Sequence, residues 1–500
     1  MKKHNLKRAL ALFLALVLLT GIFAACGESK NADSDTPKEE GAAATPSAEG
    51  GEAPEEETTY WEAVAKPDLG GIEMNAGTDY FDSNFYNVLD WEETSGDGLK
   101  DAMYTRNRGV EDALNCRFVV TYGNPSGQLE QSVYSGMGDV DFVYSLISGG
   151  GNLVQKGYLT PFNELDNIDM TQPYWDQGAQ RYLKILGQMY FGFVDFGFDH
   201  YDSLAVLFYN GALLNNYHIE DPQELVLEGK WTIDKFSEQL DAVLTDVNGD
   251  GKYTMKDDVL GLTGREYWFQ PFQYGSGVQL VTWDNAEEKF MLHMMDDNFL
   301  AVSEAIGKIY NKNNPAVDYS DYDAGRIAFS DGRSLYYSRL LGDFRQLREV
   351  EDDYGVVCFP RYAEENEDCA YFVKNPTTLF LPLVVGDDNG DGVQDFAEIG
   401  SFLEAMGAYT LSDTLNVYLE TTVIGKGMRD QKSAEMVRLM MKNRCFDLCE
   451  AFSLHSVLDA YLSAVINEGT YASSAKKVEK LFSKMTEKIT KEIEEHIAQG

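Results

Sequence analysis

The sequence predicts an α/β fold in which strands and helices alternate and the sheets are largely parallel. Two observations predict it. Short apolar runs recur along the chain, and stretches with the apolar spacing of a helix lie between them. The runs that we expect to form strands cover residues 116–122, 142–146, 204–209, 355–359 and 378–385.

Three stretches carry the clearest helical patterns. Residues 99–114 place Met103, Val110 and Leu114 on one face. Residues 233–244 carry four apolar side chains at helical spacing, Phe236, Leu240, Val243 and Leu244. The tail from Ala475 predicts an amphipathic helix. Its apolar positions are Val478, Leu481, Phe482, Met485, Ile489, Ile493 and Ile497.

Residues 1–25 are organised like a secretory signal peptide. Four basic residues precede an apolar run over residues 9–19, which is shorter than the roughly 20 apolar residues that span a bilayer. Two alanines then precede Cys26. This ending resembles the lipobox of bacterial lipoproteins, although Phe23 stands where Leu is usual. The resemblance implies that Cys26 is lipidated and becomes the mature N-terminus. The alternative is an ordinary signal peptide with an incidental cysteine.

Residues 26–59 are expected to be the lipidated Cys26 and a disordered acidic linker. Residues 27–57 contain no large apolar side chain, so they cannot bury enough surface to fold. About thirty flexible residues reach on the order of 30 Å. No later stretch is long and apolar enough to cross a membrane. We therefore expect a monomeric exported body, tethered at the outer face of the cell membrane.

The charge excludes one class of partner. The chain has 41 basic and 82 acidic residues, a net charge of −41. Removal of residues 1–25 would leave 37 basic residues against the same 82 acidic ones. Nucleic acid is therefore not expected as a partner, because binding phosphates needs a basic surface. The acidic balance is compatible with cation binding.

Cysteine usage gives no disulfide framework, because five cysteines remain after Cys26. Cys445 and Cys449 have the spacing of neighbours on a helix, where their Cβ atoms would be too far apart for an unstrained disulfide. We interpret them as buried thiols. The sequence does not decide whether Cys358 and Cys369 form a disulfide. The fifth cysteine is Cys116.

Two segments match the calcium-binding loop of EF-hands, in which oxygen ligands occupy positions 1, 3, 5, 7 and 12 and glycine occupies position 6. The second loop matches every position, whereas the first has Asp in place of Glu at position 12. The alternative is a pair of Asn/Asp/Gly surface turns. The expected ligands are Asp246, Asn248, Asp250, Lys252 and Asp257 in the first loop, and Asp387, Asn389, Asp391, Val393 and Glu398 in the second; positions 7 contribute backbone oxygens.

Neither loop has the setting of a paired calcium sensor. The first follows a helix, but Gly261 comes only four residues after the loop ends. The second follows an apolar strand and leads into a helix from Phe396. We therefore expect one or two structural calcium ions rather than a switch.

Common enzyme motifs are missing from the sequence. It has no G-x-S-x-G, P-loop, H-E-x-x-H or G-x-G-x-x-G segment. The sequence does not exclude a pair of catalytic carboxylates, because it contains 82 acidic residues. Aromatic and polar residues cluster at 267–270 and at Tyr336–Tyr337, in segments that we expect to be loops. Aromatic faces beside polar side chains suit sugar rings.

In their order along the chain, seven short segments make the sequence similar to family 1 extracellular solute-binding proteins. These are the receptors of ABC importers, and the likeness is strongest to the sugar-binding lipoproteins of Firmicutes. It extends from about residue 70 to the end. The segments are residues 98–107, 139–165, 206–230, 245–261, 329–335, 353–362 and 429–444.

The resemblance implies a two-lobed fold of the type II periplasmic-binding-protein kind, with the ligand in a cleft between lobes that crossing strands connect. One lobe would combine residues 70–198 with 372–412, and the other 199–371 with 413–500. The family's binding segments match ligand positions Phe85, Tyr86, Tyr144, Asp195, Tyr267, Trp268, Gln270 and Arg339 in this sequence.

The resulting hypothesis is a lipid-anchored receptor that captures an oligosaccharide and delivers it to an ABC permease, without catalysis. Two alternatives come from other classes. A surface glycosidase needs two carboxylates about 5–10 Å apart in one cleft. A calcium-dependent adhesion or scaffold protein would be expected to show repeats or a large exposed apolar patch.

Overall fold

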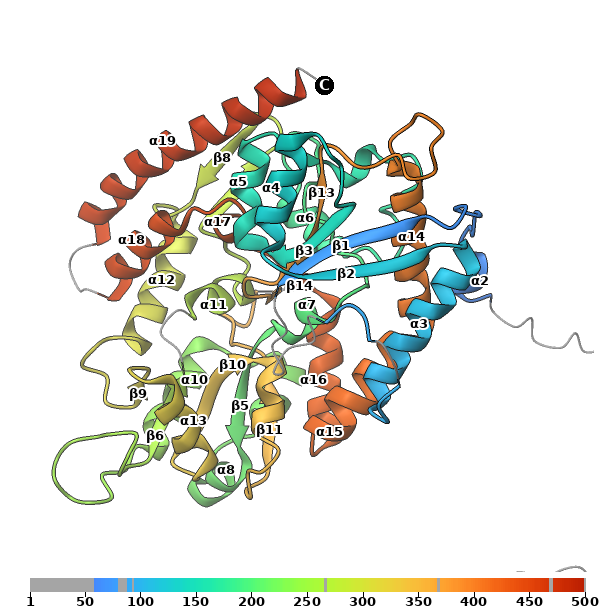
Figure 1. Cartoon of the computed structure of the whole chain (residues 1–500). Coiled ribbons are helices and arrows are strands. Elements are labelled where there is room, and N and C mark those ends of the chain that lie inside the picture. The colour runs from blue at the N-terminus through green and yellow to red at the C-terminus, as the bar shows by residue number, and fades with distance from the viewer. Residues whose placement is uncertain are drawn as a thin grey trace, which may run out of the picture. The chain divides into compact units, whose positions relative to one another are not determined.

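The computed structural model describes residues 58–79, 88–91, 94–264, 268–366, 369–466 and 471–498. Cys26, Phe85, Tyr86, Tyr267 and the signal segment lie outside these ranges, as does most of the linker. Within the ranges, strands gather into two five-stranded sheets, with helices packed around each (Figure 1). No helix of this part of the chain combines the length and apolarity that a membrane span requires.

The first large sheet has the order β2-β1-β3-β13-β4, and the second has the order β11-β5-β10-β6-β9. Two small sheets, β12-β14 and β7-β8, complete the described strands. The strands are β1 (Glu73–Asp79), β2 (Arg117–Gly123), β3 (Phe142–Leu146), β4 (Leu159–Thr160), β5 (Ala205–Asn210), β6 (Leu260–Gly264), β7 (Val281–Asp284), β8 (Lys289–Leu292), β9 (Val317–Asp318), β10 (Ser334–Leu340), β11 (Tyr354–Val357), β12 (Tyr371–Phe372), β13 (Thr377–Pro382) and β14 (Arg444–Cys445).

All five strands expected from the sequence are present as β2, β3, β5, β11 and β13, within three residues at each end. The expectation of largely parallel sheets is corrected. In the first sheet β1 runs parallel to β2 and β3, but β13 is antiparallel to β3 and β4. In the second sheet β6 runs parallel to β10 and β9, but β5 is antiparallel to β10 and β11.

Helices pack around the large sheets, and α18 and α19 form the C-terminal part of the described chain. The three expected ones are observed as α3, α10 and α19, and their apolar faces are buried. The α-helices are α2 (Tyr60–Ala63), α3 (Gly98–Leu114), α4 (Pro125–Ser135), α5 (Gly150–Gln155), α6 (Gln177–Leu183), α7 (Asp199–Asp202), α8 (Gly211–Tyr217), α9 (Pro222–Leu227), α10 (Ile233–Val243), α11 (Phe269–Gly275), α12 (Asp297–Ile309), α13 (Tyr322–Ser330), α14 (Phe396–Tyr409), α15 (Gly425–Gly427), α16 (Gln431–Lys442), α17 (Leu448–Ala451), α18 (His455–Ile466) and α19 (Tyr471–Ile497).

Three connections join the halves that the two large sheets define. Gly192 pairs with Leu379 of the first sheet, and the chain then crosses to β5 of the second. A second connection returns from β12 to β13. The third is α14, which π-helical turns extend over Thr410–Thr414 and Val417–Ile424.

The lobe boundaries given above stay a prediction, and the C-terminal helices contact both halves. α18 packs on α12 beside the second sheet, while α19 contacts β8 and also α5, which follows β3 of the first sheet. His496 on α19 lies 3.1 Å from the carbonyl oxygen of Gln155 at the end of α5. The tail therefore ties the two halves together (Figure 1).

Candidate functional site

The carboxyl ends of strands from both large sheets meet at the connections between them. The end of β3 at Leu146 pairs with Thr377, the first residue of β13 after the return connection. The end of β10 at Leu340 pairs with Ala205, the first residue of β5 after the outgoing connection. In open α/β sheets, ligands bind beyond the carboxyl ends of the strands where the chain order reverses. We call this junction the candidate cleft.

Buried polar atoms without a hydrogen-bond partner occur near strand ends, on the return connection and in the segment after β6. They include the Thr78 hydroxyl at the end of β1, the Tyr144 hydroxyl on β3 and the side-chain amide oxygen of Asn375 on the return connection. After β6, the Trp268 indole N–H and both amide atoms of Gln270 have no partner. Each unpaired buried group costs about 1–3 kcal/mol, so such groups are rare without a role. Ligand hydroxyls are groups that could pair with them.

The predicted ligand residues within the described ranges are all buried: Tyr144, Asp195, Trp268, Gln270 and Arg339. Two of them are already engaged. The Tyr201 hydroxyl donates to Asp195 at 2.6 Å, and Arg339 forms an ion pair with Asp343. Burial also raises the pKa of Tyr144 well above its ordinary value, so its hydroxyl stays protonated. Their assignment to the ligand stays a prediction.

The two aromatic clusters expected in loops are only partly in loops. Trp268 stands in the connection before α11, but Phe269 and Gln270 begin that helix. Tyr336 and Tyr337 occupy the centre of β10 and are fully buried. Trp268 directly precedes α11, is 2% exposed and stacks on Phe359 with ring centroids 6.1 Å apart. Paired aromatic residues are good strand formers, and burial of their area outweighs the polar hydroxyls, so the local pattern was misleading.

An ion pair and a hydrogen bond to Asp202, which the sequence did not reveal, position the outgoing connection. Asp202 on α7 pairs with Arg345 at 3.0 Å and accepts a hydrogen bond from the Tyr418 hydroxyl at 2.7 Å. The Tyr418 ring stacks on Phe198, with centroids 4.7 Å apart. These partners come from segments about 140 and 216 positions away. No local motif could have indicated this pairing.

A second network positions the return connection. Lys374 forms an ion pair with Glu450, and the backbone N–H of Asn375 donates to the other Glu450 oxygen at 2.6 Å. Asp447 caps α17 by accepting from the backbone N–H of Cys449 at 2.6 Å. Burial, followed by the neighbouring Glu450 carboxylate, raises the pKa of Asp447 to about 6. Two buried carboxylates thus share one lysine.

The first predicted calcium loop has the expected turn. Gly251 has a φ of +79°, as position 6 requires, and Asp246 accepts hydrogen bonds from three backbone N–H groups of the loop. Asp257 is exposed. The next residue, Asp258, is fully buried and accepts from the N–H groups of Val247 and Thr254. Asp258 therefore closes the loop, a role that the motif did not predict.

The second loop has the same organisation. Gly392 has a φ of +90°, and its N–H donates to Asp387 at 3.0 Å. Asn389 donates to Glu398 at 3.0 Å, which joins positions 3 and 12. The donor types and the glycine turns fit a calcium loop. Among the described residues, however, no three His, Cys, Asp or Glu side chains converge as a metal site.

Within the described ranges, the five cysteines, Cys116 among them, form no disulfide. The expected helical pair is wrong, because Cys445 lies on β14 and Cys449 on α17, but both are buried as predicted. Cys358 is buried and Cys369 is partly buried, and neither forms a disulfide in this structure.

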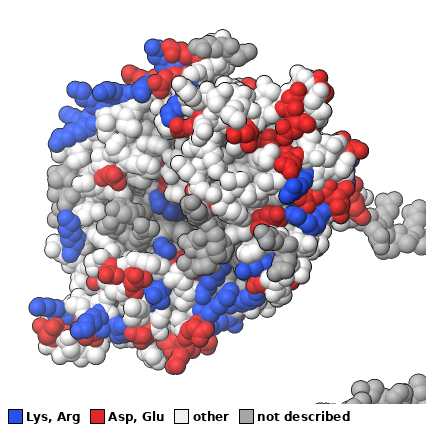
Figure 2. Space-filling view, in the orientation of Figure 1, with Lys and Arg blue, Asp and Glu red and all other residues white. Residues whose placement is uncertain are grey.

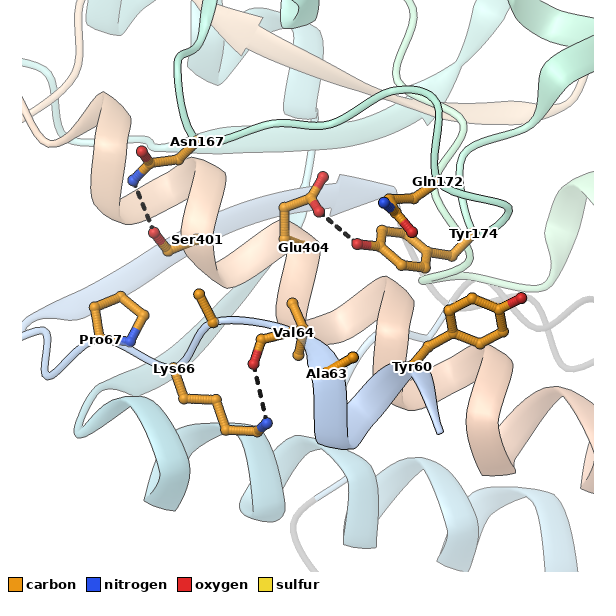
Figure 3. A pocket seen from close by; sticks show the side chains of 11 residues that line it. Tyr60, Ala63, Val64, Lys66, Pro67, Asn167, Gln172, Tyr174, Ser401 and Glu404 are labelled. Atoms are coloured by element: carbon orange, nitrogen blue, oxygen red, sulfur yellow. Dashed lines mark hydrogen bonds between the residues drawn. The ribbon is translucent and has the colours of Figure 1, made fainter. Parts of the chain in front are cut away.

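A pocket of about 660 Å³ lies away from the candidate cleft, between the segment around α2 and helix α14 (Figure 3). Glu404 of α14 lies in its wall and accepts hydrogen bonds from the Tyr174 hydroxyl at 2.5 Å and the Trp175 indole at 2.7 Å. The carboxylate is therefore satisfied by the protein. Trp61 of α2 packs on Tyr409, so the chain just after the linker rests on the third connection.

No protein-family model and no curated protein matches the sequence. Solved structures do match the fold. The extracellular solute-binding protein from Staphylococcus aureus in complex with maltose has a TM-score of 0.54 and 12% identity, over 84% of this chain and 98% of that one. An ABC substrate-binding protein from Listeria monocytogenes in complex with cycloalternan has a TM-score of 0.51 and 12% identity, over 83% and 98%.

A cyclo/maltodextrin-binding protein complexed with maltotetraose has a TM-score of 0.51 and 14% identity, over 86% of this chain and 99% of that one. These likenesses span nearly the whole length of the neighbours, and they confirm the fold that the resemblance in the sequence implied. The chain has the two-lobed α/β fold of type II solute-binding proteins.

Proposed function

We propose that this protein is the extracellular solute-binding receptor of an ABC importer and captures an oligosaccharide in the candidate cleft. The observation that carries the proposal is the meeting of strand ends from both sheets beside buried, unpaired polar groups. Neighbours with this fold were solved with maltose, cycloalternan and maltotetraose. Their shared ligand chemistry, hydroxyl-rich rings with apolar faces, matches such a lining.

The direct test is calorimetric titration of the purified protein with maltose, maltotetraose and cycloalternan. Gln270→Leu removes both unpaired amide atoms at nearly constant volume. If these atoms bind the sugar, affinity should fall about tenfold or more, because each lost hydrogen bond contributes about 1 kcal/mol. Stability should change little, since no protein partner is lost.

Gln223→Leu is the matched control, because Gln223 is equally buried but donates to Val356 and Ser433 at 2.9 and 2.8 Å. It should lower stability and leave sugar affinity unchanged. Absence of binding to every sugar tested would contradict the proposal. Recovery of a hydrolysed sugar would favour the glycosidase alternative.

Membrane attachment through Cys26 and delivery to a permease belong to the same proposal. They rest on the signal-like segment and on the acidic linker that precedes α2. Cys26→Ser should release the protein into the medium, whereas the native chain should fractionate with membranes. A variant that stays in the membrane fraction would show that Cys26 is not the anchor.

We also propose that the two loops bind structural calcium. Support comes from their donor types and from the left-handed glycines at position 6. Excess chelator should lower the melting temperature, because an ion that binds only the folded state adds about 1.4 kcal/mol at tenfold saturation. Asp391→Ala should remove most of the second loop's share, and exposed Asp388 at the non-ligating position 2 provides the control substitution. Unchanged melting with chelator would contradict both sites.

A further inference from the structure

A second pocket lies beside the connections, apart from the strand ends that form the candidate cleft. Its volume is about 390 Å³, within the range of small-molecule sites. Helix α6, which precedes the outgoing connection, forms one side, and α11 and β7 form the other. The lining residues are Arg181, Tyr182, Lys184, Tyr274, Gly277, Gln279, Thr282, Trp283, Asn285, Ala370 and Asn443.

The charge of this pocket is opposite to that of the molecule. The chain has twice as many acidic as basic residues, yet none of the described residues that line the pocket is Asp or Glu. Arg181 in the last turn of α6 and Lys184 at its C-cap both face it. Neither has an ion pair among the described residues. Two cations without a carboxylate partner favour an anionic ligand.

The rest of the lining suits a sugar ring. Tyr182 meets Tyr274 edge to face, with centroids 5.7 Å apart. Trp283 on β7 adds a third aromatic ring, and its indole N–H is buried without a hydrogen-bond partner. Aromatic rings pack against the C–H faces of sugars, and the unpaired N–H can donate to a hydroxyl.

We propose that this pocket binds an anionic monosaccharide, either a hexuronate or a sugar phosphate, separately from any ligand of the candidate cleft. Arg181 and Lys184 would hold the carboxylate or phosphate, and Trp283 would donate to a ring hydroxyl. An inorganic anion such as phosphate would contact only the two cations and would gain nothing from the aromatic rings.

The test is calorimetry with glucuronate, glucose 6-phosphate, glucose and inorganic phosphate as probes, at low salt because the cations are exposed. At least one anionic sugar should bind, and about tenfold tighter than glucose or phosphate. Arg181→Gln together with Lys184→Gln should weaken that binding about tenfold or more. Comparison of glucuronate with glucose 6-phosphate distinguishes a carboxylated from a phosphorylated ligand.

The matched control is Lys480→Gln with Lys484→Gln on α19, a helix over which basic side chains gather (Figure 2). Both lysines are exposed, and neither has an ion pair among the described residues. It should leave binding unchanged. Absence of binding by both anionic sugars, equal binding of phosphate alone, or equal losses in both double variants would each overturn the proposal. Binding of neutral oligosaccharides should survive in the Arg181/Lys184 double variant, so the outcome is independent of the proposed function.

Discussion

At the scale of single residues, burial decides what the aromatic and acidic side chains can do. Trp268 is 2% exposed and stacks on Phe359, so its ring is part of the core in this structure. Tyr134 on α4 is 86% exposed, so its truncation removes little buried area. Two aromatic residues of similar chemistry therefore have different roles.

Trp268→Ala is expected to lower the free energy of unfolding by about 3–5 kcal/mol, because it removes a large buried ring and leaves a cavity. Tyr134→Ala should change it by no more than about 0.5 kcal/mol. Urea denaturation of both variants checks this. If Trp268→Ala leaves stability unchanged and only weakens sugar binding, the ring faces the ligand and not the core.

Asp447 makes stability depend on pH. An aspartate whose folded pKa of about 6 exceeds its unfolded value of about 3.9 binds protons more strongly when folded. Its contribution is therefore present at low pH and is lost as the pH rises through about 6. We expect a loss on the order of 3 kcal/mol as the pH rises from about 4 to about 6. Asp447→Asn should remove the loss; a variant with the native pH profile would contradict the prediction.

At the scale of elements, the amphipathic pattern of α19 determines how the tail docks. Val478, Phe482, Ile489 and Ile493 are buried against neighbouring elements, while the lysines of the helix are exposed. The helix has 27 residues and contacts both halves. Its stability in the protein thus comes from the buried face, as is usual for helices in folded domains.

Ile493→Asp is expected to destabilise the protein by about 3 kcal/mol or more, because it buries an unpaired charge. Ile497 lies one helical turn later but is 42% exposed, so Ile497→Asp should change stability by about 0.5 kcal/mol at most. Thermal melts of the two variants test this. Equal effects would show that the end of α19 is not docked.

At the scale of the whole molecule, three connections join the two halves, and the candidate cleft lies where they cross. Ion pairs at Asp202 and Lys374 fix the first two connections near the cleft. A ligand that contacts both halves favours whichever arrangement brings them together, because only a difference in contacts can shift such an equilibrium.

Saturation with a bound oligosaccharide should therefore reduce the radius of gyration measured by small-angle X-ray scattering. Maltotetraose is the first probe, and Gln270→Leu at the same concentration is the control, in which the change should be smaller. An unchanged radius for the native chain at demonstrated saturation would count against ligand contact with both halves.

Local sequence was sufficient for much of the secondary structure. The run at 142–146 is β3 at the expected residues, because five successive residues suit a buried strand. β1 was missed, since Glu73, Asn75 and Asp79 interrupt its apolar pattern. The expected loop at Tyr336–Tyr337 is a central strand because burial between neighbours, and not local polarity, decides that position.

The sequence by itself determined the α/β class, the expected export signal, the excess of acids and the glycine turns of both predicted calcium loops. These depend on composition and on neighbours along the chain. Only the tertiary structure decided which polar groups lie together at the cleft. Leu146 meets Thr377, and Asp202 meets Tyr418, across more than 200 residues. Such pairings depend on how the sheets assemble, and no local pattern specifies them.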